Sequence, residues 1–291
     1  MKEALSKVPK NRGVAKKEPK PSKEAKTAKK VEKSSRGVLK ILAMAFLMLV
    51  FVGATTIASQ LIVGYIMLWI IGPTEFSKTV PMAVYSALSY IVATGFIVYV
   101  TREIRIRFLL KDEKQKSEQR AKGKLRKELG LTGLPTWTDI GLAPVGFLAS
   151  ILLAAGLVWV FSLFPWFNVE EAQSVGFSLY VTGVERVITF VVLVVIAPIF
   201  EEIIFRGWLY GKLRGLFSEK ISEIAGIIVA NFLVSLLFGI VHLQWNVGVN
   251  VFALSVVLCA LREVTGTIYA GILTHMVKNG VAFYLLYVMG V

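Results

Sequence analysis

Long apolar runs set the main limit on how this chain can fold. Several of them reach about 20 residues, enough for a helix to cross roughly 30 Å of hydrocarbon. The chain is 55% hydrophobic and its mean hydropathy is +0.67, whereas soluble domains are about 45–50% apolar even with glycine counted. The sequence therefore predicts an all-α, multi-pass bundle of transmembrane helices.

Turn residues and charges between the runs predict about seven spans. Gly72 and Pro73 end the first run, and Lys212, Arg214 and Lys220 follow the fourth. The sixth run is short for a full crossing, so six or eight crossings also remain open. The expected spans are 38–71, 80–100, 142–164, 184–210, 221–243, 247–261 and 266–291.

Positive charge is concentrated in two blocks. Residues 1–37 hold 13 Lys and Arg against 4 acids, and residues 102–128 hold 11 against 5. Basic segments beside apolar spans stay on the cytoplasmic side. Residues 165–183 contain Glu170 and Glu171 without any Lys or Arg, which suits the outer side. We therefore expect a multi-pass protein of the cell membrane with a cytoplasmic N-terminus.

The basic blocks also suggest three regions. Residues 1–37 contain almost no large apolar side chains, so we expect a disordered cytoplasmic tail that contacts anionic lipid headgroups. Residues 38–128 would form two N-terminal transmembrane helices and a charged cytoplasmic loop, and residues 129–291 the remaining core. No aromatic residues interleave with the basic ones, so nucleic acid is not an expected partner. The lone Cys259 excludes an intrachain disulfide.

The ionisable residues within the apolar segments include Glu201, Glu202, Arg206, His242 and His275. The two histidines are the only ones in the chain. Such groups cost several kcal/mol in a membrane span and usually face a polar cavity that carries function. The sequence therefore predicts a site within the membrane.

Helical spacing separates the two carboxylates. Glu202 and Arg206 are four residues apart, so they share a face and can form an ion pair. Glu201 lies about 100° away and stays free to face a cavity, where it can act as a general base. The alternative is that both carboxylates only bridge to arginines and hold the bundle together.

The two histidine segments have the same four-residue spacing. His275 and Asn279 can together stabilise an oxyanion, or hydrogen-bond between spans. Phe238 can wall the cavity beside His242, or belong to an ordinary core. On straight helices, Glu201 and His242 would differ in depth by more than about 10 Å.

These residue types permit three chemistries. Glutamate with histidine can activate water for hydrolysis. Glu201, His242 and His275 also match the ligand types of a catalytic zinc site, which leaves zinc open as a cofactor. A chain of acids and histidines could instead relay protons in a transporter.

Three motifs in order resemble the CPBP family of CAAX prenyl proteases, abortive-infection and bacteriocin-processing membrane proteases. They are Glu-Glu-x-x-x-Arg at 201–206, Phe-x-x-x-His at 238–242 and His-x-x-x-Asn at 275–279. The resemblance covers about residues 129–291, which would then be an intramembrane protease core. The Leu-Gly-Leu stretch at 129–131 is similar to the lead-in usual in this family.

The resemblance implies an intramembrane endopeptidase that cleaves a membrane-associated peptide, a prenylated C-terminal peptide among the candidates. Glu201 and His242 would activate water, and His275 and Asn279 would hold the oxyanion. Glu202 and Arg206 would support them. Many members are labelled metalloproteases, so the metal requirement stays open. The alternatives are a non-catalytic membrane scaffold or immunity protein, and a proton- or metal-coupled transporter.

Overall fold

A computed structural model describes residues 23–168, 181 and 183–290, with side chains from residue 37 onward. Residues 1–42 and 43–291 form separate units, and each is considered by itself. In the first unit, helix α1 begins at Lys23, within the segment expected to be disordered, where Ala, Lys and Glu favour helix. The rest of that tail and most of the expected outer loop lie outside the described residues.

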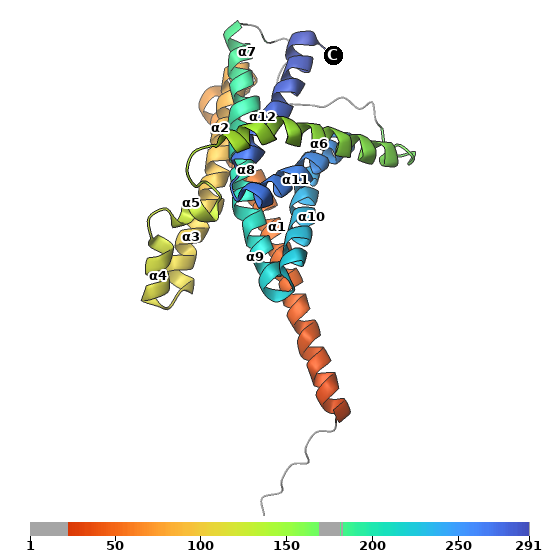
Figure 1. Ribbon diagram of the computed structural model, residues 1–291. Helices are drawn as coiled ribbons and strands as arrows, with labels where there is room; N and C mark the ends of the chain where they lie inside the picture. Colours follow the sequence, from red (N-terminus) through yellow and green to blue (C-terminus); the bar gives the residue numbers. More distant parts are fainter. Residues whose placement is uncertain (1–22, 169–180, 182, 291) are drawn as a thin grey trace, which may run out of the picture. The chain divides into compact units, whose positions relative to one another are not determined.

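The regular structure of the described residues consists of helices, without any strand (Figure 1). Seven of the helical stretches are long and apolar enough to cross a membrane, as the sequence predicts. The elements, with η for π-helical segments, are α1 Lys23–Phe76, α2 Thr79–Thr94, η1 Gly95–Val100, α3 Thr101–Ile104, η2 Arg105–Leu109, α4 Glu113–Arg120, α5 Lys124–Glu128, α6 Trp137–Phe161, α7 Gly183–Phe190, η3 Val191–Ile196, α8 Ala197–Glu202, η4 Ile203–Tyr210, α9 Gly211–Lys220, α10 Glu223–Ile240, α11 Trp245–Thr265, α12 Tyr269–Tyr284 and η5 Leu285–Met289.

One continuous rod forms the backbone of the second unit. It runs from α7 through η3, α8 and η4 to α9, and it covers 38 residues, or about 57 Å at 1.5 Å per residue. The expected fourth span ended near Tyr210, but the helix continues to Lys220. Lys212 and Arg214 are compatible with this extension because both are good helix formers.

The helical hairpin of α9 and α10 brings Glu201 and His242, from two different motifs, to the same depth. The chain turns at Ile221 and Ser222, and α10 packs back along α9, with the Ser222 side chain capping its first turn. Glu201 precedes this turn by about 20 residues, and His242 follows it by about 20. The depth difference expected between these two residues is therefore absent, because the fourth helix continues to the turn.

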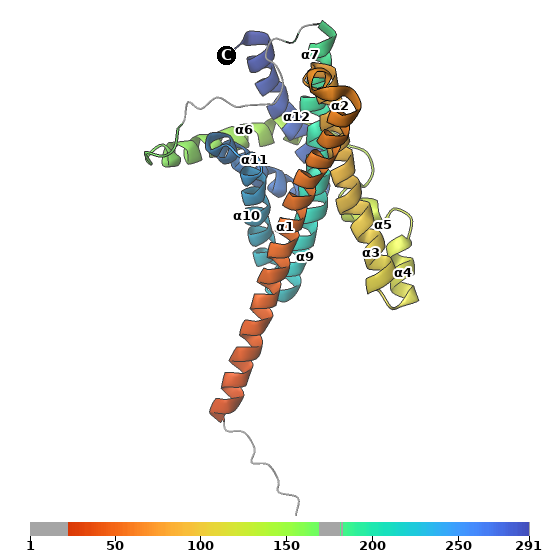
Figure 2. The ribbon, with the colours of Figure 1, turned by 180° about the vertical axis from the view of Figure 1, so that it is seen from behind.

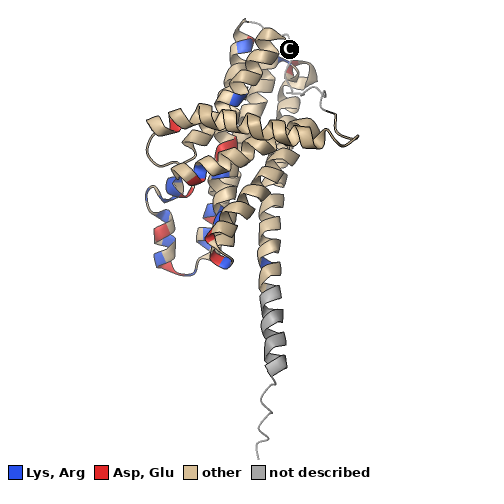
Figure 3. Cartoon of the chain, turned by 45° about the vertical axis from the view of Figure 1, so that its right-hand side comes forward, with Lys and Arg blue, Asp and Glu red and all other residues tan. Residues whose placement is uncertain are grey.

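Helix α6 runs across the rod rather than along it, as three views show (Figures 1, 2 and 3). A capping box between Thr136 and Asp139 starts this helix at Trp137, a few residues before the third span expected from residue 142. Helix α6 packs mainly against α11 and α12. Gly146 permits the close approach, since a Cβ there would lie 2.8 Å from Thr274 Oγ1 on α12.

Helices α1 and α2 form a hairpin at the side of the rod. Gly72 breaks the helical geometry of α1 just before Pro73, as the sequence predicts. Helix α2 packs against α7, η3 and α8, and Phe51 of α1 contacts the ring of Trp208 in η4. The hairpin therefore lies directly against the segment that carries the adjacent glutamates (Figure 2).

Charged side chains gather around α3, α4, α5 and the turn between α9 and α10 (Figure 3). Ion pairs such as Arg214–Glu263 and Arg214–Glu223 join the ends of α9, α10 and α11 there. The expected cytoplasmic loop at 102–128 and the basic end of the fourth span thus belong to the same charged region. By contrast, the long helices are mostly uncharged along their length.

The Leu129–Leu131 lead-in is held by one half-buried arginine. Arg262 of α11 donates to the carbonyl oxygens of Leu129 and Glu128 at 3.0 and 3.1 Å. The amide of Ile268 donates to the Gly130 carbonyl at 3.0 Å. Gly130 has φ +72°, and a Cβ there would lie 2.3 Å from Arg262 Nη1. Only glycine fits both the backbone angle and the arginine.

The substitution Gly130→Ala should therefore destabilise the protein more than Gly133→Ala. Both place Ala at positive φ, which costs about 1–2 kcal/mol, but nothing lies within 4 Å of a Cβ at Gly133. Gly130→Ala also displaces the Arg262 guanidinium from the carbonyl oxygens of Leu129 and Glu128, which should lower the free energy of unfolding by about 1–3 kcal/mol more. Thermal unfolding of both variants in detergent measures the difference. Equal melting temperatures would contradict the role of Arg262.

Candidate active site

A fully buried ion pair lies at the centre of the site. Arg206 Nη1 donates to Glu202 Oε1 at 2.8 Å, and both side chains have an exposed fraction of 0%. This is the pair predicted from the four-residue spacing. The Arg206 guanidinium also lies 4.5 Å from the centre of the Phe238 ring, a cation–π contact that links the rod to α10.

Glu201 is the less buried carboxylate, with a side-chain exposed fraction of 15%. The Tyr90 hydroxyl of α2 donates to Glu201 Oε1 at 2.5 Å. The other oxygen, Oε2, lies 3.7 Å from His275 Nε2, which is longer than a hydrogen bond. Glu201 is therefore separate from the Glu202–Arg206 pair, as expected, and a tyrosine orients it.

His275 connects the two carboxylates. Its Nδ1 lies 3.1 Å from Glu202 Oε1, and because a carboxylate only accepts, Nδ1–H is the donor. The nitrogen that faces Glu201 is then Nε2. Glu202 thus fixes both the orientation of the ring and the position of one of its protons.

His242 lies in the short connection between α10 and α11. Its Nδ1–H donates to the Phe238 carbonyl oxygen at 2.7 Å, so Nε2 has its lone pair free when the ring is neutral. Desolvation lowers the pKa of His242 below its ordinary value, which favours the neutral ring. The Phe238 ring lies 5.1 Å from the His242 ring and 5.9 Å from the His275 ring. Phe238 therefore packs between the histidines.

Asn279 contacts the rod rather than a neighbouring polar side chain. Its Nδ2 donates to the Leu193 carbonyl oxygen at 2.9 Å. In η3 the amide of Ala197 bonds to the carbonyl five residues earlier, so the Leu193 carbonyl would pair with residue 198. That residue is Pro198, which has no N–H. Asn279 thus supplies the donor that proline lacks, and keeps one further N–H for other contacts.

Lys278 also belongs to the surroundings of Glu201. The charge of Lys278 interacts with that of Glu201, and it affects His242 as well. The described residues include no ion pair of Lys278.

The residues considered as zinc ligands do not form a metal site. No group of three His, Cys, Asp or Glu among the described residues is placed to hold a metal ion. Within the expected set of Glu201, His242 and His275, the Nδ1 atoms of both histidines donate to oxygen atoms, which leaves Nε2 of each ring as the nitrogen that could bind a metal. The zinc cofactor expected from the residue types therefore stays a prediction.

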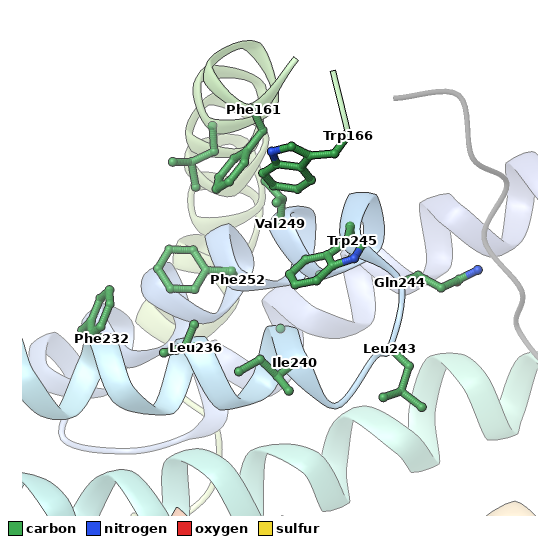
Figure 4. Close-up of a pocket in the computed structure, with 13 residues that line it drawn as sticks. Phe161, Trp166, Phe232, Leu236, Ile240, Leu243, Gln244, Trp245, Val249 and Phe252 are labelled. Carbon is green, nitrogen blue, oxygen red and sulfur yellow. The ribbon is translucent and has the colours of Figure 1, made fainter. Parts of the chain in front are cut away.

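A large apolar pocket lies next to His242. Its volume is about 690 Å³, and Figure 4 shows its side chains converging from the end of α6, from α10 and from α11. Leu243 and Gln244, which directly follow His242, form part of its wall. The other lining residues are Leu157, Phe161, Trp166, Phe232, Leu236, Gly239, Ile240, Trp245, Gly248, Val249 and Phe252.

Sequence reasoning missed Tyr90 and the apolar pocket. Tyr90 lies 111 residues before Glu201 and has no motif around it, so only the packing of α2 on α8 identifies it. The pocket forms from three helices whose apolar residues look like ordinary span residues. The π-helical segments on both sides of Glu201 and Glu202 were also not expected, although Pro198 was a visible signal.

Comparison with known proteins supports the resemblance. Residues 183–281 match a family model described as type II CAAX prenyl endopeptidase, Rce1-like. All three motifs fall within this stretch, so the resemblance to the CAAX prenyl protease family is confirmed. No curated protein and no solved structure matched significantly.

The Asn279–Leu193 bond gives a test that separates structure from chemistry. Asn279→Ala leaves the Leu193 carbonyl without its donor and should cost about 1–3 kcal/mol of stability. Adding Pro198→Ala restores a backbone N–H, so the double variant should regain much of the loss in thermal unfolding. No recovery would show that the proline does not cause this contact. Activity of the double variant then reports any direct role of Asn279.

Proposed function

We propose that this protein is an intramembrane endopeptidase that hydrolyses a peptide bond of a membrane-associated substrate with water activated by Glu201 and His242. The family match supports a CAAX-type membrane protease in general terms. One observation carries the finer proposal: His275 lies next to both Glu201 and Glu202, and the Phe238 ring lies next to both His275 and His242, although these residues come from segments far apart in the sequence.

In this mechanism Glu201 removes a proton from water, and His242 Nε2 orients the water by accepting its second hydrogen. The oxygen attacks the scissile carbonyl carbon, and the carbonyl oxygen becomes an oxyanion. His275 Nε2–H and the remaining N–H of Asn279 donate to it. Because Nδ1–H of His275 already donates to Glu202, the ring acts as an imidazolium in this step.

Collapse of the tetrahedral intermediate breaks the C–N bond. Glu201 returns its proton to the leaving nitrogen, so the products are an amine and a carboxylic acid. Glu202 and Arg206 touch no reacting atom in this scheme. Their role is to hold His275, since Glu202 binds its Nδ1, and to balance charge within the site.

The apolar pocket beside His242 favours a substrate with a hydrocarbon group near the cleaved bond. Its lining is almost entirely aliphatic and aromatic, and its volume lies in the range of small-ligand sites. A prenylated C-terminal peptide fits this description, because its lipid and its scissile bonds are only a few residues apart. The pocket would hold the prenyl group of the substrate while its peptide part reaches Glu201.

The charged region around α3–α5 and the α9–α10 turn supports a cytoplasmic placement of that side under the positive-inside rule. The N-terminus would then also be cytoplasmic, and the basic tail would contact anionic headgroups. Residues 38–128 would form an N-terminal helical region and residues 129–291 the protease core.

The substitution Glu201→Gln should abolish cleavage, because an amide cannot accept the proton from water. The expected loss in kcat is at least about 10²-fold, and thermal unfolding should change little, since glutamine can still accept from Tyr90. Cleavage of a farnesylated C-terminal peptide and of a panel of membrane-anchored peptides measures it. Glu219→Gln, an exposed glutamate at the end of α9, is the matched control. Retained cleavage by Glu201→Gln would disprove the mechanism.

The substitution Leu157→Trp should fill part of the apolar pocket. We expect KM for a farnesylated peptide to rise severalfold, because the longer chain loses its packing contacts, and KM for a geranylated peptide to rise less. Leu152→Trp, on the exposed face of the same helix, is the control. Equal effects on both chain lengths would argue against this pocket as the lipid site.

A further inference from the structure

The α1–α2 hairpin lies outside the stretch that matches the family model, yet it reaches the candidate active site. We infer that it has two parts in the reaction: Tyr90 positions Glu201, and a polar pocket beside Tyr90 holds water that supplies the site of Glu201. This inference rests on the proposed function. It adds a positioning residue and a water site that the three motifs do not contain.

Tyr90 constrains Glu201 by two contacts. Its hydroxyl donates to Glu201 Oε1, and its ring stacks on the neighbouring Phe200, with centroids 6.5 Å apart and planes 9° apart. With one carboxylate oxygen held, the other is directed toward His275. Tyr90 therefore determines which Glu201 oxygen is available to take a proton.

A small polar pocket opens between α1 and α2 beside Tyr90. Its volume is about 80 Å³, room for roughly two to three water molecules at about 30 Å³ each. Most of its lining side chains carry a hydroxyl or an amide. They are Thr56, Ser59, Gln60, Tyr85, Ser86, Ser89 and Tyr90, together with Ala93.

The position of these groups identifies water as the occupant. On the outer faces of the same helices, apolar side chains such as Leu61, Ile62 and Ile91 are exposed. The Thr56 and Ser59 hydroxyls donate to backbone carbonyls, but their lone pairs can accept from water and not from hydrocarbon. Ser59 and Ser89 are buried on the face of the hairpin that meets Tyr90, while Gln60 lines the pocket and is exposed.

Four side chains lie around Glu201. They are Tyr90 from α2, His275 and Lys278 from α12, and His242 from the α10–α11 connection. Removing the Tyr90 hydroxyl removes the hydrogen bond that holds Oε1 and leaves the other groups in place. The Glu201 carboxylate can then turn, so that Oε2 is no longer held in the orientation in which it takes a proton.

Tyr90→Phe should lower kcat with an unchanged KM. The expected loss in kcat is about tenfold or more, the size expected for one hydrogen bond to a charged group. Tyr99→Phe, on the same helical stretch and exposed, is the control. A variant that is only less stable would lose activity near its melting temperature and keep wild-type kcat well below it. Wild-type kcat of folded Tyr90→Phe well below its melting temperature would therefore overturn the positioning role.

The water site can be tested without any substrate. Hydroxyl radicals generated from water by a short X-ray pulse label nearby tyrosines, here in protein reconstituted in lipid nanodiscs. Tyr85 lines the pocket, whereas Tyr65 of α1 is 73% exposed toward the lipid region. The two have similar depth, because the residue before Tyr65 is Gly64, which faces the Tyr85 ring. Tyr85 should be labelled severalfold faster than Tyr65.

The two readouts separate the possible failures. Equal labelling of Tyr85 and Tyr65 would overturn the water site even if the protein is a protease. Faster labelling of Tyr85, together with no cleavage of any peptide by wild-type protein, would instead count against the proposed function. Gln60→Leu makes the pocket less polar and should reduce both the labelling of Tyr85 and kcat. Unchanged values for both would contradict the inference.

Discussion

The buried contact between Glu202 and Arg206 is the interaction on which the site depends. Removing either charge leaves the other uncompensated at a fully buried position, which typically costs about 3–5 kcal/mol. The pair also extends to two other helices, since Glu202 accepts from His275 and Arg206 packs over Phe238. A single ion pair thus joins the rod, α10 and α12, the three elements that carry the motifs.

Around this pair, the helices bring functional groups from several spans to one depth. Hydrolysis needs groups from several spans at one depth, but each span is a separate apolar helix. The antiparallel register of α9 and α10 brings His242 to the level of Glu201, and Asn279 joins α12 to η3 where Pro198 leaves a carbonyl unpaired. Helix α6 crosses behind α11 and α12 and holds them in place.

Much of this arrangement could be predicted from the sequence, because it depends on periodicity. The all-helical class, the seven apolar stretches and the Glu202–Arg206 pair all follow from hydropathy and four-residue spacing. The depth of His242 could not be predicted, because the end of the fourth helix was placed at Tyr210 instead of Lys220. Tyr90 depends on tertiary packing between separate helices, which no local pattern reports.

The hairpin of α9 and α10 also couples the lengths of its two legs, the segments that run from the turn at Ile221 and Ser222 to Glu201 and to His242. A residue inserted into one leg alone would rotate its functional group by about 100° and raise it by about 1.5 Å, whereas matched insertions of whole turns in both legs would leave the site intact. The legs thus fix a distance of roughly 30 Å between the turn and Glu201. A substrate peptide that enters from the side of the α9–α10 turn must therefore extend about 30 Å before its scissile bond reaches the Glu201 carboxylate.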